Sequence, residues 1–212
     1  MDIASPKRRF SHGSYCGGIG IVASAGGIPA LIELLSRLNG TFPIPILVAQ
    51  HLPRTFSNLD VILSRHCPLR VRWADADRLD DDLIGVTLAA PGTGIRMTGA
   101  GIAIDRLASP STSWLLSGDL MIQSLLSMFG QRTVGIVLSG MLPAAIAGMK
   151  AITAAGGITM AQDRAAAYFE MPSAAIDFGR AEIVAPPSRM AEMLTVIAED
   201  WRELYGSNAS GM

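Results

Sequence analysis

The sequence has few charged side chains and almost no net charge. Charged residues make up 17% of the 212 positions, and 50% are hydrophobic. An ordinary globular domain has about a quarter charged residues. A disordered regulator needs more charge and less apolar surface, so that class is excluded. The 17 basic and 18 acidic side chains leave a formal charge of −1, which predicts no attraction to nucleic acid or to an acidic membrane surface.

Cysteine is scarce as well. Cys16 and Cys67 cannot form a disulfide framework, and no secretory apolar segment follows the basic Lys7-Arg8-Arg9. We therefore expect a cytoplasmic protein. No set of three His, Cys, Asp or Glu residues has the spacing of a metal site, so we expect neither a metal nor a cofactor.

Long uninterrupted apolar runs are also missing. Residues 10–32 carry no charge and residues 133–162 carry only Lys150, but Gly, Ser and Pro interrupt both stretches. Neither provides the ~20 continuous apolar residues of a membrane span, so we expect no membrane insertion. A parallel sheet covered on both faces explains the low charge better, because its strands are near-continuous apolar runs.

Apolar runs alternate with helical patterns along the chain. The predicted strands are Gly18–Ala23, Pro45–Gln50, Leu69–Trp73, Gly85–Ala89, Thr133–Leu138, Gly157–Ala161 and Ile183–Ala185, with a small hairpin of Ile95–Met97 and Gly101–Asp105. The predicted helices are Pro29–Leu38, Phe56–His66, Gly118–Phe129, Pro143–Ala155, Pro172–Phe178 and Met190–Tyr205. This order predicts an α/β fold, a doubly wound, mainly parallel sheet with helices on both faces. We expect one domain over residues 16–205, between flexible tails at 1–15 and 206–212.

Two residues with catalytic potential follow consecutive predicted strands. Ligands of open α/β sheets bind beyond the carboxyl ends of the strands. Ser24 follows the first strand and His51 the second, as a nucleophile and its general base require. His12, near the N-terminus, and His66, on a predicted helix, are weaker candidates.

Ser24 has two other interpretations. It can simply cap the helix that follows it. Alternatively, residues 18–23 match the Gly-x-Gly-x-x-Ala of dinucleotide sites, although these glycines fall inside the strand and no acidic ribose partner is evident. The Gly-x-Ser-x-Gly turn of many hydrolases is half present, because Val22 replaces its first glycine.

The segment Ile21-Val22-Ala23-Ser24-Ala25-Gly26-Gly27 resembles the Ile-Gly-Ala-Ser-Thr-Gly-Gly of the CheB-type chemotaxis protein-glutamate methylesterases. Further matches follow in family order: Val48-Ala49-Gln50-His51-Leu52-Pro53, Leu88-Ala89-Ala90-Pro91-Gly92, Ser117-Gly118-Asp119, Leu138-Ser139-Gly140-Met141, Ala161-Gln162-Asp163 and Met171-Pro172-Ser173-Ala174-Ala175-Ile176. The resemblance implies a cytosolic serine hydrolase that removes methyl groups from glutamyl esters on chemoreceptors. It implies Ser24 as nucleophile, His51 as general base, and backbone N–H groups around Ala25 and Met141 as oxyanion donors.

The chain departs from the family at the third triad member. The family continues Gly-Met-Gly-x-Asp-Gly, whereas residues 140–145 read Gly-Met-Leu-Pro-Ala-Ala, which puts Ala144 in the place of the aspartate. Other departures are Thr93-Gly94-Ile95 in place of a segment with a histidine, Trp114-Leu115 in place of a His-Arg pair, and Glu170 in place of a glycine. In serine proteases, disabling the aspartate lowers turnover by about 10⁴. We therefore expect a weak esterase in which no acid replaces the aspartate; the candidate substitute acids are Glu170 and, less readily, Asp163.

A second functional class stays open. Trp114, Leu115, Leu142 and Ile95 can make the former cleft apolar, as in a catalytically inactive domain that binds a protein in a chemosensory pathway; the alternative for these side chains is core packing. The expected partner is a methylated chemoreceptor or a similar helical protein. Family members commonly carry an N-terminal receiver domain, and the stretch before Gly18 is too short for a domain of roughly 120 residues. We expect phosphorylation control, if present, to come from a separate receiver-domain protein.

Overall fold

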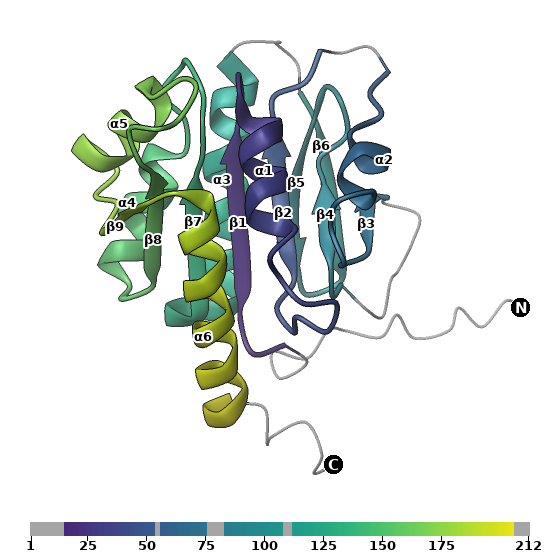
Figure 1. Ribbon diagram of the computed structural model, residues 1–212, viewed down its shortest axis with the longest axis vertical. Coiled ribbons are helices and arrows are strands. Elements are labelled where there is room, and N and C mark those ends of the chain that lie inside the picture. Colours follow the sequence, from purple (N-terminus) through teal and green to yellow (C-terminus); the bar gives the residue numbers. More distant parts are fainter. Residues whose placement is uncertain (1–14, 54–55, 76–82, 108–111, 206–212) are drawn as a thin grey trace, which may run out of the picture.

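Seven strands form the central sheet of the computed structural model, which describes residues 15–53, 56–75, 83–107 and 112–205 (Figure 1). The strands are β1 (Gly18–Ala23), β2 (Ile46–Gln50), β3 (Val71–Trp73), β4 (Val86–Leu88), β7 (Thr133–Val137), β8 (Ile158–Gln162) and β9 (Ile183–Ala185), and their order is β3-β4-β2-β1-β7-β8-β9. Every neighbouring pair in this sheet is parallel. The prediction of a parallel, doubly wound sheet is confirmed, with β3 at an edge and β7 inside.

The chain builds this sheet outward from its centre. It runs from β1 to β2 and on to the β3 edge, then returns to β7 beside β1 and continues to β9. The direction of winding therefore reverses between β1 and β7. In folds of this kind the ligand site lies at that point, beyond the carboxyl ends of the strands.

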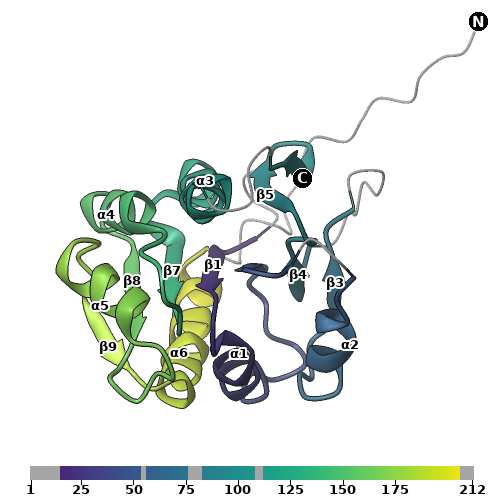
Figure 2. The same cartoon turned by 90° about the horizontal axis from the view of Figure 1, so that it is seen from above.

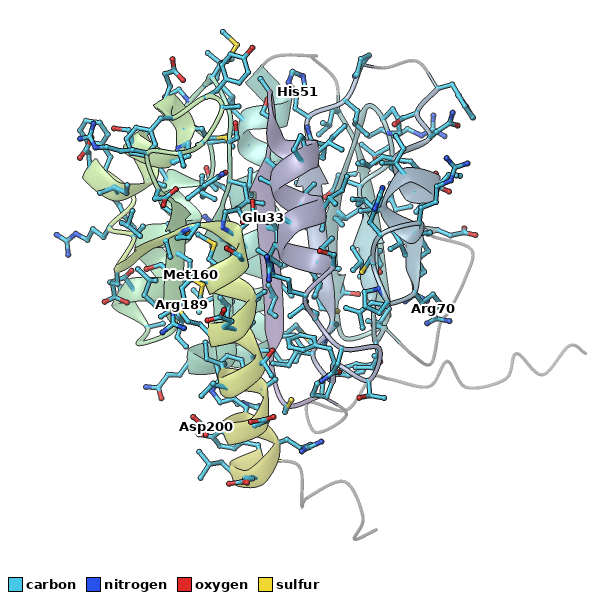
Figure 3. The ribbon with its side chains drawn as sticks, in the orientation of Figure 1. Glu33, His51, Arg70, Met160, Arg189 and Asp200 are labelled. Carbon is cyan, nitrogen blue, oxygen red and sulfur yellow. The ribbon has the colours of Figure 1, made fainter. Side chains whose placement is uncertain are left out.

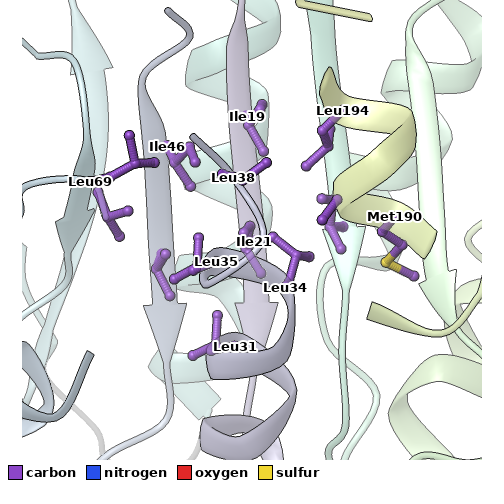
Figure 4. Packing of buried hydrophobic residues seen from close by; sticks show 14 of the residues in the cluster. Ile19, Ile21, Leu31, Leu34, Leu35, Leu38, Ile46, Leu69, Met190 and Leu194 are labelled. Carbon is purple, nitrogen blue, oxygen red and sulfur yellow. The ribbon is translucent and has the colours of Figure 1, made fainter. Parts of the chain in front are cut away.

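Helices cover both faces of the sheet, as Figure 2 shows from above. On one face lie α1 (Gly27–Leu35), α2 (Leu59–Ser64) and α6 (Pro187–Tyr205), and on the other lie α3 (Thr112–Phe129), α4 (Ile146–Ala154) and α5 (Glu170–Asp177). Figure 4 shows the first face, where leucines of α1 and Met190 and Leu194 of α6 pack onto Ile19 and Ile21. These side chains are fully buried. The removal of these apolar side chains, and of those on the opposite face, from water makes the main contribution to the stability of the fold.

Two glycines inside β1 allow α3 to lie close to the sheet. A Cβ at Gly18 would lie 2.5 Å from the Phe129 ring, and one at Gly20 would lie 3.0 Å from a Leu125 methyl group. Both glycines belong to the strand, not to the turn that follows it. The dinucleotide interpretation is therefore wrong, because its first glycine must form the tight turn after the strand.

A separate hairpin of β5 (Thr93–Thr98) and β6 (Gly101–Arg106) lies against α3. Ser124 of α3 donates a hydrogen bond to the Met121 carbonyl and accepts one from the Met97 N–H at 2.9 Å. Arg96 and Asp105 form a two-pronged ion pair across the hairpin, at 2.6 and 2.7 Å. The guanidinium lowers the pKa of the Asp105 carboxyl through these hydrogen bonds. The predicted hairpin is confirmed, and it is longer at both ends than expected.

Several predicted helix boundaries are wrong. The fourth predicted helix begins at Ile146 instead of Pro143, because Ala145 adopts a left-handed backbone conformation with φ 61°. α3 begins at Thr112, well before the predicted Gly118, and α2 is shorter than predicted at both ends. The expected tails, residues 1–15 and 206–212, lie outside the described residues apart from Tyr15.

Cys16 and Cys67 are free and buried, and burial raises the pKa of both thiols. Among the helices that the structure describes, none has the length and apolarity to cross a membrane.

Candidate active site

Ser24 and His51 lie side by side where β1 and β2 end. The register pairs Ala23 with Gln50, and the His51 N–H donates to the Ala23 carbonyl at 2.9 Å. Ser24 and His51 are the next residues of their strands, as predicted from the sequence. Figure 3 shows His51 at the top of the molecule, near the N-terminal end of α1. Ser24 is half-buried and His51 is exposed.

The two side chains are within contact distance. Ser24 Oγ lies 3.4 Å from His51 Nδ1. If the serine hydroxyl donates, Nδ1 is the unprotonated ring nitrogen and the proton of the neutral ring is on Nε2. The separation exceeds a short hydrogen bond, but catalytic hydrogen bonds are often long in unliganded sites and shorten when substrate binds.

Ser24 does not cap α1, so that interpretation is wrong. The N-cap is Gly26, with φ 70°, and no side chain caps the helix. Ser24 takes part in the turn through its carbonyl, which accepts the Gly27 N–H at 2.9 Å. Its hydroxyl is left to interact with the histidine.

Ser139, which follows β7, holds the serine turn from its other side. The Ser139 carbonyl accepts the Ser24 N–H at 2.9 Å, and the Ser139 hydroxyl donates to the Ala25 carbonyl at 2.7 Å. The same hydroxyl accepts the Tyr168 N–H at 3.0 Å. Ser139 is fully buried. It therefore fixes the backbone on both sides of the Ser24–Ala25 peptide.

The backbone N–H groups of Ala25 and Met141 are available to a ligand. Within the described part of the chain, neither donates a hydrogen bond to a protein group. Ala25 follows Ser24 directly, and Met141 lies two residues beyond Ser139, whose carbonyl is bonded to Ser24. Unpaired N–H groups beside a nucleophile are the usual donors to a developing oxyanion.

Ala144 lies in the loop from β7 to α4 and is 3% exposed. The next residue, Ala145, is fully buried and has a left-handed conformation, for which an alanine is poorly suited. The loop therefore has, at residue 145, a backbone shape that suits glycine better than alanine.

Glu170, the suggested substitute acid, is exposed at the start of α5. The Gly140 N–H donates to the Tyr168 carbonyl at 3.0 Å and the Met171 N–H donates to the Gly140 carbonyl at 2.8 Å, which places Glu170 beside the loop that carries Met141. Among the described residues, its carboxylate makes no hydrogen bond to His51. Asp163 accepts the Ala165 N–H in the turn after β8.

The residues expected to make the cleft apolar fall into different environments. Ile95 is 1% exposed and belongs to the core, so the core-packing alternative holds for this side chain. Leu115 is partly buried against the same core, and the side chain of Trp114 lies outside the described residues. Leu142 is 51% exposed, next to Met141 at 55%.

Sequence reasoning gave no role to Gln50, which ends β2 and is 7% exposed. Its Nε2 donates to the carbonyls of both Ser24 and His51. Among the described residues, no group of three or more His, Cys, Asp or Glu side chains could hold a metal ion.

The N-cap residue of α4, Ala145, makes no side-chain hydrogen bond to the helix, and Asp119 of α3 binds the first N–H groups of α4 instead. Its Oδ1 accepts the Gly148 N–H at 2.7 Å, and the Ala147 N–H also bonds to the carboxylate. Burial raises the pKa of Asp119, and these two N–H groups oppose the rise. Asp119 therefore fixes the start of α4 and, with it, the end of the loop that contains Ala144.

The raised pKa predicts how stability depends on pH. Between the unfolded pKa and the higher folded pKa, the folded state binds more protons, so stability falls as pH rises through this interval. In urea unfolding from pH 4 to 7.5, wild type should lose stability relative to Asp119→Asn, by at most about 1.4 kcal/mol per pH unit. A difference that is constant or moves the other way would contradict this assignment.

Comparisons with known proteins agree with this geometry. Residues 19–194 match the model of the CheB methylesterase family. Protein-glutamate methylesterase/protein-glutamine glutaminase 3 of Myxococcus xanthus is 39% identical over 178 residues, which are 82% of this chain and 49% of that protein. Protein-glutamate methylesterase/protein-glutamine glutaminase 1 of Carboxydothermus hydrogenoformans is 36% identical over 81% of this chain and 52% of its own length. The chain thus spans about half the length of these relatives.

The fold matches a solved structure. The crystal structure of the Thermotoga maritima CheB methylesterase catalytic domain superimposes with a TM-score of 0.73, at 24% identity, and covers 85% of this chain and 98% of that one. The family match spans both Ser24 and His51 and most of the described chain. This chain belongs to the CheB methylesterase family.

Proposed function

We propose that this protein is a serine hydrolase that removes methyl groups from glutamyl esters of a chemoreceptor-type protein. The contact of 3.4 Å between Ser24 Oγ and His51 Nδ1 at the ligand-binding end of the sheet carries the proposal. Family membership supports the ester chemistry.

The geometry supports a two-step reaction. Ser24 Oγ attacks the ester carbonyl carbon while His51 Nδ1 takes the hydroxyl proton. The N–H groups of Ala25 and Met141 bind the oxyanion. The C–O bond to the methoxy group breaks, the histidine returns the proton, and methanol leaves. Water then attacks the acyl-enzyme with the same histidine as base, which regenerates Ser24 and releases the glutamate carboxylate.

We propose that turnover is slow because of Ala144. Without a carboxylate at this position, the imidazolium formed in each step is less stabilised and less well oriented. In serine proteases this deficit is about 10⁴ in turnover, or roughly 5 kcal/mol, yet the oxyanion site still catalyses. Among the described residues the exposed Glu170 makes no hydrogen bond to His51, so Glu170→Gln should hydrolyse both esters at nearly the wild-type rate; a large loss would identify Glu170 as the replacement acid.

Ser24→Ala should reduce hydrolysis to the rate without enzyme. The measurement is release of p-nitrophenol from p-nitrophenyl acetate and of methanol from a methylated receptor fragment. Ser36→Ala is a matched control, because Ser36 is exposed just after α1 and bonds only to its own turn. Equal rates for wild type and Ser24→Ala would end the proposal.

A second function is a catalytically inactive, protein-binding domain. Met141, Leu142 and Tyr168 beside the site are 55%, 51% and 41% exposed, and such apolar side chains favour contact with a partner. In that case wild type hydrolyses neither ester, and a receptor fragment binds wild type and Ser24→Ala equally well. Leu142→Asp should then weaken binding, whereas Val196→Asp on α6, 57% exposed, should not.

A further inference from the structure

Gln50 contacts the backbone of both members of the dyad. Its Nε2 lies 2.9 Å from the Ser24 carbonyl oxygen and 3.1 Å from the His51 carbonyl oxygen. Two carbonyl oxygens can only accept, so the side chain between them must donate twice. The amino group of a carboxamide has two N–H donors and meets this demand with one atom.

The other end of the same carboxamide is not satisfied. Among the described residues, Gln50 Oε1 is buried and has no hydrogen-bond partner. A Cβ at Gly27 would lie 2.6 Å from this oxygen, so the glycine makes room for the carboxamide. A buried acceptor without a partner is unfavourable. The two hydrogen bonds that Nε2 donates to the strand ends are therefore accompanied by an unfavourable acceptor at Oε1.

Gln50 links the backbone of His51 directly to that of Ser24. The sheet ladder ends with the bond from the His51 N–H to the Ala23 carbonyl. Ser24 has further support, because Ser139 holds its N–H and the Gly27 N–H holds its carbonyl. The Gln50 side chain ties the carbonyl of His51 to that of Ser24 across the two strand ends.

We propose that Gln50 is a positioning residue that sets the distance between Ser24 and His51. This inference rests on the proposed function and deepens it. A displacement of about 1 Å at a reacting pair can cost about 10²-fold in rate. The Oγ–Nδ1 separation is already 3.4 Å, so the transfer of the proton has little tolerance for a further shift.

Gln50→Met and Gln50→Glu test this role. Met keeps the length of the side chain and removes both donors, and ionised Glu places an acceptor against two acceptors. Both should lower kcat by about 10²-fold while KM changes less than about twofold. The thermal midpoint of Gln50→Met should fall only modestly, because the loss of two hydrogen bonds is partly offset by the removal of the unpaired acceptor.

Gln162→Glu is the matched control. Gln162 also ends a strand, is 6% exposed, and accepts the Ser139 N–H at 2.9 Å through Oε1. A carboxylate keeps this acceptor, so the activity of Gln162→Glu should fall far less than that of Gln50→Glu.

At low pH the introduced carboxyl group of Gln50→Glu is protonated and regains one donor, so the activity of this variant relative to wild type should rise as pH falls. The thermal midpoint of Gln50→Glu, measured at the same pH values, separates this profile from a loss of folded protein.

Two readouts do not depend on the methyl ester. One is the rate at which a fluorophosphonate labels Ser24, and the other is the ¹⁵N shift of His51 Nδ1. In Gln50→Met the labelling should slow by about 10²-fold, and the Nδ1 shift should move toward its value in Ser24→Ala. A wild-type protein that hydrolyses no ester ends the proposed function, and the Nδ1 shift still decides the role of Gln50. Gln50→Met with wild-type labelling and shift, or Gln162→Glu as damaged as Gln50→Glu, would overturn the inference.

Discussion

Replacing Ala144 by Asp, together with Leu142→Gly and Ala145→Gly, should raise the rate of ester hydrolysis by about 10²- to 10⁴-fold. The new carboxylate would stand where the family pattern has its aspartate, and it would stabilise the protonated His51 formed in each step. The two glycines restore the Gly-x-Asp-Gly loop. Ala145 already adopts the left-handed conformation that a glycine accepts without strain, at φ 61°.

The control for this variant replaces Ala144 by Asn in the same glycine background. Asn has the shape of Asp without its charge, and in serine proteases that exchange alone removes about 10⁴ of turnover. The measurement is initial rate against p-nitrophenyl acetate, with thermal unfolding to show that each variant folds. An equal gain for the Asn variant would show that loop flexibility, not a carboxylate, limits the reaction. No gain in a folded Asp variant would mean that this position does not face His51.

The sequence contains most of the information that specifies the sheet. β1 and β9 have the predicted boundaries, and the other predicted strands shift by only a few residues, because apolar runs of four to six residues between turn residues fit a buried parallel strand well. The helix starts were harder to predict. A proline at residue 143 suggested a helix start, but the backbone at Ala145 delays α4 to Ile146. That left-handed conformation is imposed by the loop and leaves no local signal when the residue is alanine.

The candidate site is likewise only partly predictable from the sequence. The adjacency of Ser24 and His51 follows from strand order, since parallel neighbours end at the same edge. The supporting side chains could not be assigned from the sequence, because their partners are backbone groups of other strands. Gln50 and Ser139 were visible as polar residues at the ends of apolar runs, and this signal marks them as buried polar groups in need of partners. Which groups they bind is a property of the fold.

Gly26→Ala should damage both stability and activity. Gly26 has φ 70°, and a Cβ there would lie 2.7 Å from both the Ala167 Cβ and the Ser139 Oγ. The left-handed conformation costs an alanine about 1–2 kcal/mol, and the forced contacts add about 1–3 kcal/mol. The free energy of unfolding, measured in urea, should fall by roughly 2–4 kcal/mol after the smaller entropy of the unfolded alanine chain is counted.

Gly130→Ala is the control that separates the stability cost of backbone strain from the cost of close atomic contacts in Gly26→Ala. Gly130 also has a positive φ, 55°, but a Cβ there has no neighbouring atom within 4 Å, so only the cost of about 1 kcal/mol for the backbone should appear. Activity should remain at the wild-type level in Gly130→Ala and fall by about 10²-fold in Gly26→Ala. The reason is that Ser139 Oγ must move away from the new methyl group, and the same oxygen holds the carbonyl of Ala25 beside the nucleophile. If both variants lose stability equally and keep full activity, the turn after β1 does not depend on Ser139. The hydroxyl of Ser24 is then positioned by β1 alone.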